Sequence, residues 1–328
     1  MQRQPTRLFA IDSARGLGII LVVFGHAWRG AMGAGMVPDQ ALFRMIDAGI
    51  YRFHMPLFFF LSGLIFLDVL KKHDALSLFR GRVSRLLWPM ALWTWLFFGI
   101  KLGAGAAANN PVTLGEFPVI PLPPYEHLWF LWALFLCQTL GIALYPFGKA
   151  RNQTVVASVV GGAAVVMAIL NPYTPVPSLI WGPMVQHLPH FLAGVSLGGL
   201  GIFAIRRSVS LIAASIFVGV MVFIPADKAL VFTSLVLVIL AWVTWVGIDQ
   251  NSDTVGRALH VLRYLGRASM VIYLTHTVFS AALRIGLLKL QIDTLWVVVT
   301  LTTLIGLVAP LGVLWGAQKL RLAKVLGF

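Results

Sequence analysis

Charged residues are scarce in this 328-residue chain: they make up 11% of the sequence, whereas 59% of the residues are hydrophobic and the mean hydropathy is +0.88. A soluble domain carries about 25% charged residues. Less than half of that fraction cannot cover the surface of a water-soluble globule of this size. The composition therefore excludes a soluble protein and predicts that lipid surrounds most of the molecule.

Cysteine and acidic residues are also rare, and each shortage excludes a class of site or partner. The single cysteine, Cys137, lies in an apolar run, so no intramolecular disulfide framework can form. No cluster of cysteine and histidine suggests zinc, and we expect no metal site. The 25 basic residues exceed the 11 acidic ones, but they lie in short loops between apolar runs. This pattern is typical of membrane orientation, so we expect no nucleic-acid partner.

Long apolar runs, in contrast, fill the chain. A transmembrane helix needs about 20 largely apolar residues, and about ten segments meet this need, separated by short loops and by two proline-rich stretches at Asn109–Pro124 and Asn171–His187. The sequence predicts an all-α, polytopic membrane helix bundle that forms one domain over residues 1–328. The expected spans are Leu8–Trp28, Tyr51–Leu70, Leu86–Gly105, His127–Phe147, Thr154–Leu170, Leu188–Ile205, Ser210–Ile224, Leu230–Ile248, Ser269–Leu288 and Leu295–Ala317.

The distribution of lysine and arginine predicts the orientation of these spans. With both termini in the cytoplasm, the inner segments hold 17 basic residues and the outer segments hold 7. This excess supports an even number of spans with both ends inside. The first 30 residues loosely resemble a signal peptide, but Arg15 and His26 flank the apolar run and no small-x-small cleavage site follows it. We therefore expect the first segment to be retained.

Two polar residues within the first expected span, Arg15 and His26, are the most informative pair in the chain. They are eleven positions apart, which is about three full helical turns, so both side chains lie on one stripe, separated by roughly 16 Å along the axis. Asp12 joins this stripe. An arginine inside a membrane is costly and usually faces a bundle interior or a watery cavity. The simpler interpretation is that Arg15 anchors the helix and His26 bonds to a carbonyl at the interface.

The residues around this pair carry a family resemblance. The run Asp12–Gly16 followed by Val22–His26 resembles the opening of acyltransferase family 3, a family of membrane O-acyltransferases marked by an arginine, ten intervening residues and a histidine. The segment Arg52–Gly63 is similar to the second-helix motif of its fucose 4-O-acetylase-like branch, and Arg82–Pro89 is similar to its basic turn. Weaker matches are Leu128–Leu131, Phe191–Gly194 and Tyr273–His276.

The resemblance implies an activity and a place for it. Members of this family move acyl groups from cytoplasmic acyl-coenzyme A to sugars outside the cytoplasm, so we expect a multi-pass protein of the bacterial inner membrane with acetyl-CoA as donor and a glycan or glycolipid as acceptor. His26 is the expected general base, because imidazole titrates near ~6.5 and can accept a hydroxyl proton. A covalent acyl-histidine intermediate is the alternative route. Arg15 would share the catalytic stripe, and Arg82 and Arg85 could hold the phosphates of coenzyme A.

Further polar residues near the outer face are candidates for binding the acceptor. Arg52 and His54 begin the second expected span, and Glu126 and His127 begin the fourth. Arg52 and His54 could equally well anchor the helix at the membrane interface. For Glu126, the simpler interpretation is a negative charge that stabilises the start of a helix.

Three other histidines receive structural interpretations. His187 and His190 have a metal-like spacing, but no third ligand is evident and Pro189 argues against a regular helix between them. His276 is expected to lie in the middle of the ninth span, where it could support the cavity; a packed structural histidine is the simpler interpretation.

Two other classes of function remain open. A transporter of a polysaccharide unit or small solute often shows internal repeats, and the spacing of Arg15 and His26 has no counterpart in the second half of the chain, where Arg267 and His276 are separated by eight residues. A noncatalytic partner in an envelope complex is the third class. It predicts that His26→Ala leaves the glycan phenotype intact.

Overall fold

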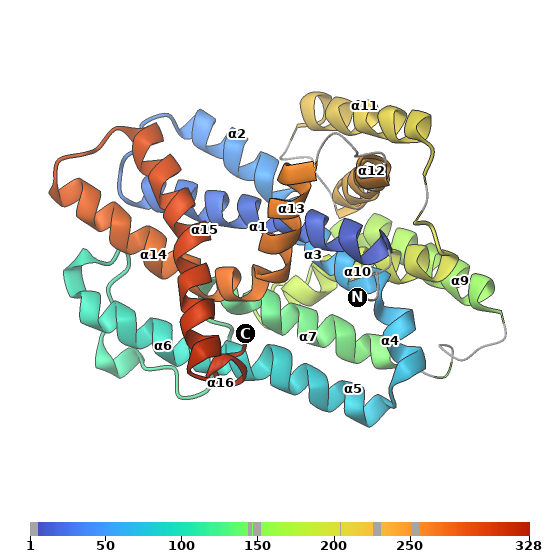
Figure 1. Ribbon diagram of the computed structural model, residues 1–328, viewed down its shortest axis with the longest axis horizontal. Helices are drawn as coiled ribbons and strands as arrows, with labels where there is room; N and C mark the ends of the chain where they lie inside the picture. Colours follow the sequence, from blue (N-terminus) through green and yellow to red (C-terminus); the bar gives the residue numbers. More distant parts are fainter. Residues whose placement is uncertain (1–5, 144–145, 147–151, 204, 226–230, 251–255) are drawn as a thin grey trace.

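Every regular element that the structure describes is a helix. The computed structural model describes residues 6–143, 146, 152–203, 205–225, 231–250 and 256–328 (Figure 1). The predicted all-α class is therefore confirmed. In chain order the elements are α1 (Thr6–Gly33), α2 (Gln40–Tyr51), α3 (His54–Leu64), α4 (Phe66–Lys72), α5 (Ala75–Arg82), η1 (Val83–Leu87), α6 (Trp88–Ala104), η2 (Gly105–Ala107), η3 (Leu114–Glu116), η4 (Glu126–Leu128), α7 (Trp129–Ile142), α9 (Gln153–Leu170), η5 (Asn171–Tyr173), α10 (Gly182–Leu200), α11 (Arg207–Phe223), α12 (Val231–Gln250), α13 (Gly256–Arg267), α14 (Ser269–Lys289), α15 (Leu295–Lys319) and α16 (Ala323–Leu326).

Seven helical stretches among the described residues are long and apolar enough to cross a membrane. Each of the ten expected spans coincides with a helix, but α7 and α11 have only 14 and 17 residues, and α10 carries Gln186, His187 and His190. These three helices are therefore too short or too polar to be counted among the helices that could cross a membrane. The count of ten spans and the cytoplasmic location of both termini stay predictions. Phe147 and Leu230, which bound two expected spans, lie outside the described residues.

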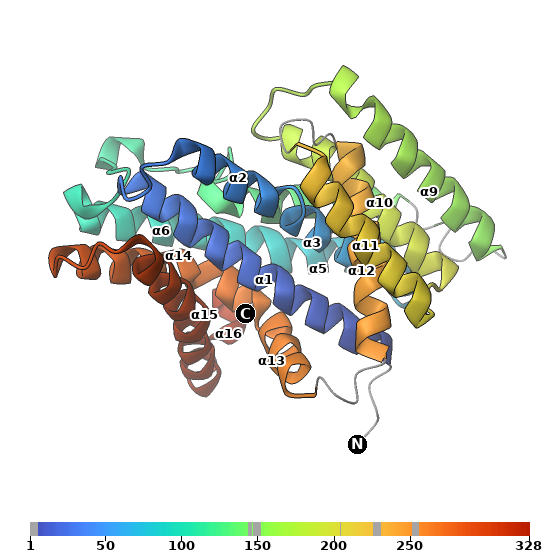
Figure 2. The same ribbon diagram turned by 90° about the horizontal axis from the view of Figure 1, so that it is seen from above.

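The helix α1 crosses the middle of the molecule (Figure 2). The helices α9, α10, α11 and α12 gather on one side of it, and α6, α14 and α15 lie on the other side. Along its length α1 packs against α3, α13, α14 and α15. A helix surrounded in this way exposes little of its surface to lipid, so polar side chains on α1 can be accommodated inside the bundle.

The packing of α3 against α10 is close because glycines line the contact. A Cβ atom on Gly194 would come within 2.0 Å of the backbone oxygen of Phe60, and one on Gly63 would come within 2.1 Å of the oxygen of Phe191. Small residues that let two backbones approach are the usual device for helix association in lipid. This contact holds α3, which begins at His54, against α10.

One local expectation is wrong. The prolines of Asn171–His187 predict a loop or an interfacial segment, and Pro189 argues against a regular helix around it. No α-helix occurs from Asn171 to Trp181, but α10 begins at Gly182 and continues through Pro189. Proline is tolerated inside membrane helices where neighbouring helices compensate for the lost backbone hydrogen bond, and α3 and α9 both pack against α10.

The helices α2 and α13 were not expected, since neither contains a run of about 20 apolar residues.

Candidate active site

The polar stripe of α1 faces the interior of the protein. Arg15 and His26 belong to one continuous helix of 28 residues, so their spacing places them on one face. Ile19 and Val22 lie between them on the same face, and each is 1% exposed within the largest apolar core. This stripe is therefore not directed at lipid. The interior location agrees with the sequence-based interpretation, while the catalytic roles of Arg15 and His26 stay predictions.

Two histidines from distant parts of the chain lie beside His26. The ring centroid of His26 lies 5.0 Å from that of His276 on α14 and 5.5 Å from that of His127 in η4, and the last two are 5.4 Å apart. We call His26, His127 and His276 the histidine cluster. Among the described residues, no group of three or more histidine, cysteine or acidic residues has the geometry to hold a metal ion. Histidine side chains in such a cluster can transfer protons, form hydrogen bonds or act as nucleophiles.

The hydrogen bonds of His276 identify the nitrogen that is free to act. Its Nδ1 lies 2.9 Å from the carbonyl oxygens of both Ile272 and Tyr273. Carbonyl oxygens only accept hydrogen bonds, so Nδ1 carries the proton and the Nε2 of the neutral ring is an acceptor. The Nε2 atoms of His276 and His127 are buried and have no hydrogen-bond partner among the described residues. Buried polar atoms of this kind are uncommon and indicate a place for a substrate or water.

Neighbouring aromatic side chains fix the position of His127. The Tyr273 hydroxyl donates a hydrogen bond to the His127 carbonyl oxygen. The rings of Tyr273 and Phe97 make edge contacts with the His127 imidazole at 5.3 Å and 5.1 Å. His26, in contrast, is partly exposed. Within the histidine cluster, His127 is therefore fixed by its neighbours, whereas His26 is accessible.

His54 and Arg52, the two candidates at the start of the second expected span, contact different parts of the protein. His54 is fully buried, and its Nδ1 lies 2.8 Å from the oxygen of Ile50. Its ring makes an edge contact with Tyr51 at a centroid distance of 4.5 Å, and Tyr51 lies against Gly25, the residue before His26. Arg52 is 8% exposed, and its Nη1 donates to the oxygen of Ile224 at the end of α11 over 2.9 Å. The structure therefore brings His54 toward the histidine cluster, whereas Arg52 ties the α2–α3 junction to α11.

Glu126 lies beside the histidine cluster but pairs with a residue that the sequence did not single out. Its carboxylate forms an ion pair with Lys101 at the end of α6. The Lys101 ammonium also lies 5.5 Å from the centre of the Tyr125 ring. The backbone φ of Glu126 is +44°, a conformation that costs roughly 1–2 kcal/mol in a residue other than glycine. The strained turn directs His127 into the cluster while Glu126 stays at the surface.

The two arginines expected to bind phosphates lie around a single π-helical turn, η1, which joins α5 to α6. Arg82 is partly buried and its Nε has no hydrogen-bond partner among the described residues, whereas Arg85 is exposed. The positive charge of Arg85 acts on Arg82. Two like charges held together attract anions, and π-helical turns are frequent at functional sites. Their role as a phosphate site stays a prediction.

Two further buried histidines, His187 and His190, lie outside the histidine cluster. The ring of His187 stacks between Phe59 and Trp129, with centroid distances of 4.6 Å and 5.4 Å. The Nε2 of His190 lies 2.6 Å from the hydroxyl of Ser234 on α12. Both contacts are those of packed interior side chains, so we assign the pair no part in the candidate site.

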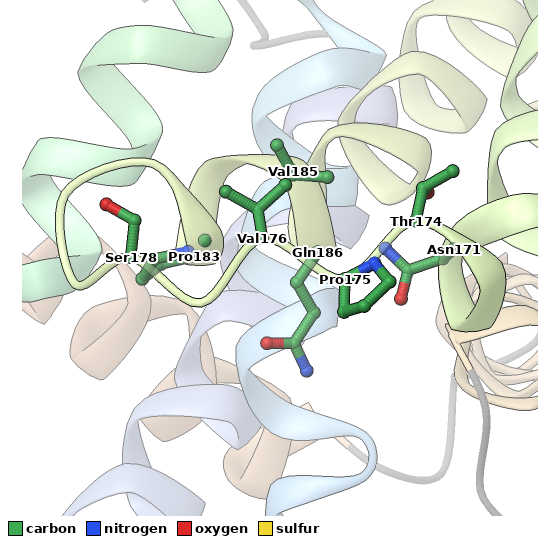
Figure 3. Close-up of a pocket in the computed structure, with 9 residues that line it drawn as sticks. Asn171, Thr174, Pro175, Val176, Ser178, Pro183, Val185 and Gln186 are labelled. Carbon is green, nitrogen blue, oxygen red and sulfur yellow. The ribbon is translucent and has the colours of Figure 1, made fainter.

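Two cavities are prominent in the described structure, and both lie away from the histidine cluster. One of about 290 Å³ opens at the connection of α9 and α10, where Asn171, Thr174 and Gln186 line it (Figure 3). The other, of about 610 Å³, is almost wholly apolar and is lined by Leu17 on α1 and Phe217 on α11, among others. Neither cavity is lined by Arg15 or His26.

The structure also reveals site residues that sequence reasoning missed or ranked low. His276 is a packed, buried histidine as expected from the sequence, and the structure adds that it lies against His26 and His127. The sequence by itself marks Lys101 and Arg284 only as two of the basic residues expected in outer segments. For Arg284 a signal was present: it lies inside an apolar run near the end of the ninth expected span.

Comparison with known proteins places this arrangement in a family. The sequence model of the family described as an acyltransferase domain, acyltransferase 3, matches residues 8–315, which is nearly the whole chain. The chain belongs to the acyltransferase 3 family. Family membership and the apolar helices together establish a membrane protein.

Two curated relatives share part of the sequence. Nodulation protein NolL of Mesorhizobium japonicum is 27% identical over 158 residues, which are 48% of this chain and 41% of the relative. Nodulation protein NolL of Sinorhizobium fredii is 30% identical over 145 residues, which are 44% of this chain and 39% of the relative. The aligned part of the chain thus spans about two fifths of these relatives. No solved structure matches the chain.

Proposed function

We propose that this protein is an O-acyltransferase of the bacterial inner membrane that moves an acetyl group from cytoplasmic acetyl-CoA to a sugar hydroxyl of an extracytoplasmic glycan. The observation that carries the proposal is the histidine cluster. His26 is partly exposed, and the buried Nε2 atoms of His127 and His276 beside it have no partner among the described residues. Membership of the acyltransferase 3 family supports the reaction class.

In the proposed step His26 acts as general base. The sugar hydroxyl gives its proton to a ring nitrogen of His26 while its oxygen attacks the thioester carbonyl. The tetrahedral intermediate then collapses, the carbon–sulfur bond breaks, and the leaving thiolate takes the proton from the imidazolium. The Nε2 atoms of His127 and His276 would accept hydrogen bonds from the acceptor or from His26. A covalent acyl-histidine route uses the same residue as nucleophile.

The donor would bind at the opposite end of α1. Arg82 and Arg85 supply two guanidinium groups for the phosphates of coenzyme A, and Arg15, with Asp12 acting on its charge, lies on the stripe that leads toward His26. Ile19 and Val22 occupy the middle of this stripe, so the pantetheine arm would run beside their side chains.

Removing the two phosphate-binding charges is expected to weaken donor binding. The double variant Arg82→Gln, Arg85→Gln should raise the KM for acetyl-CoA about tenfold or more with little change in kcat, because the interaction is made equally in ground and transition states. The measurement is the initial rate of acetyl transfer by membrane vesicles at varied acetyl-CoA. Arg207→Gln removes an exposed charge elsewhere and should leave KM unchanged. An unaltered KM in the double variant would contradict the assignment.

The acceptor and the acyl group can be named in one experiment. Cell-surface glycans are compared by mass from wild type, a deletion strain, and the His26→Ala and Arg15→Ala variants at equal abundance. We expect the deletion and both variants to lose the same discrete acyl mass. Glycans that keep this mass in both point variants would reject the mechanism. Solute flux in proteoliposomes that contain no acyl donor would instead favour a transporter.

A further inference from the structure

A buried arginine with no counter-ion among the described residues lies against Gly30 of α1, four residues after His26. Arg284, in the last third of α14, is 7% exposed. Its Nη2 donates to the side-chain oxygen of Asn109 over 3.1 Å, and no described carboxylate pairs with it or acts on its charge. A guanidinium has five N–H donors, and the Arg284 nitrogens other than Nη2 are not fully enclosed by the described residues, so they remain open to a ligand or to water.

The surroundings of Arg284 are shaped to hold it. A Cβ atom on Gly30 of α1 would come within 2.2 Å of the Arg284 Nη1, so the guanidinium packs directly against the bare backbone of Gly30 and would have to shift if residue 30 carried a side chain. The Asn109 side-chain nitrogen also lies 3.4 Å from the Gly30 oxygen. Asn109 itself is exposed. Arg284 is thus held against α1 beneath a surface residue and not extended toward the lipid, where an anchoring arginine would place its charge.

The Arg284 guanidinium lies near the face of α1 that carries His26, the proposed general base. Gly30 follows His26 by four residues, which places it about 6 Å farther along α1 and near the same face. His276, which contacts His26, and Arg284 are on the same helix. The guanidinium therefore lies roughly one helical turn beyond the reacting group, on the side from which the acceptor would arrive.

An uncompensated buried charge is costly, and it is commonly retained where it binds a partner of opposite sign. We propose that Arg284 binds an oxyanion carried by the acceptor sugar, so that the substrate of this protein is an anionic glycan with a carboxylate or phosphate beside the acylated hydroxyl. The planar guanidinium suits bidentate pairing with either group. This inference rests on the proposed acyltransfer at His26 and adds the chemical class of its acceptor.

Binding of simple sugars tests the proposal without requiring acyl transfer. The full chain in phosphatidylcholine nanodiscs is titrated with glucuronate, glucose 1-phosphate and the neutral methyl glucoside. We expect at least one anionic sugar to bind about 30-fold more tightly than the neutral sugar, because an unpaired buried charge gains strongly from its partner. Which of the two binds more tightly distinguishes a carboxylate from a phosphate. Equal binding of all three sugars would overturn the proposal.

Three variants test whether Arg284 is the source of the preference for an anionic sugar. Arg284→Gln should abolish the preference for the anionic sugar. Gly30→Ala keeps the charge but displaces the guanidinium, so it should reduce the preference too and decides the matter if Arg284→Gln fails to fold. Arg44→Gln removes an exposed charge on α2 and should preserve the preference. A preference that survives in both of the first two variants would overturn the assignment.

Two controls separate this inference from the proposed acyltransfer and from lipid binding. His26→Ala should still prefer the anionic sugar although it no longer transfers acetyl, so a failed acyltransfer mechanism and a failed anion site give different results. In nanodiscs of phosphatidylglycerol the sugar preference should persist. Its loss there would identify a lipid headgroup as the anion and would overturn the proposal.

Discussion

Replacing His26 by alanine is expected to lower kcat for acetyl transfer by about 10²–10⁴-fold, the usual contribution of a positioned general base. The loss follows from the place of this ring, which is the partly exposed member of the histidine cluster. His127 and His276 are held by other contacts and cannot move into its position. The measurement is the rate of transfer from labelled acetyl-CoA to the envelope glycan by membrane vesicles with equal amounts of protein.

The control for this prediction is a histidine outside the cluster. His260 is exposed on α13, and His260→Ala should keep the wild-type rate. Added imidazole should partly restore the His26→Ala rate, since the small base can occupy the space that the side chain leaves. If His26→Ala retained more than about a tenth of wild-type kcat, the assignment of His26 as general base would be wrong.

A methyl group at Gly194 is expected to destabilise the whole bundle. The added Cβ would meet the backbone oxygen of Phe60 at 2.0 Å and the nitrogen of Leu64 at 3.0 Å. Backbone atoms cannot rotate away, so α3 and α10 must separate, and overpacking of this kind costs roughly 1–3 kcal/mol or more. Gly194→Ala should therefore unfold at a lower temperature in detergent, as followed by size-exclusion chromatography after heating.

The matched variant for Gly194→Ala is Gly162→Ala on α9. A Cβ atom at Gly162 would meet nothing within 4 Å, and this residue is exposed, so the substitution should leave the unfolding temperature unchanged or raise it slightly through better helix propensity. Equal unfolding temperatures for the two variants would mean that the α3–α10 contact is not a stabilising close approach.

Much of the site near His26 could be predicted from local sequence. Helical periodicity placed Arg15 and His26 on one face of α1 because the angle between two residues of a helix depends only on their separation. The place of His127 at the start of a membrane helix also followed from the end of an apolar run. The partners of these residues did not follow. His276, Lys101 and Arg284 come from parts of the chain whose positions relative to α1 depend on helix packing.

What the sequence by itself determined is the membrane class and the approximate position along the chain of the long apolar helices, since both depend on the number and spacing of apolar residues along one segment. Only the tertiary structure decided which polar side chains from different helices lie close together. The histidine cluster, the Arg284–Asn109 hydrogen bond and the continuation of α10 through Pro189 all depend on contacts between helices far apart in the chain. Such contacts are set by the shapes of packed surfaces, which the periodicity of a single helix does not encode.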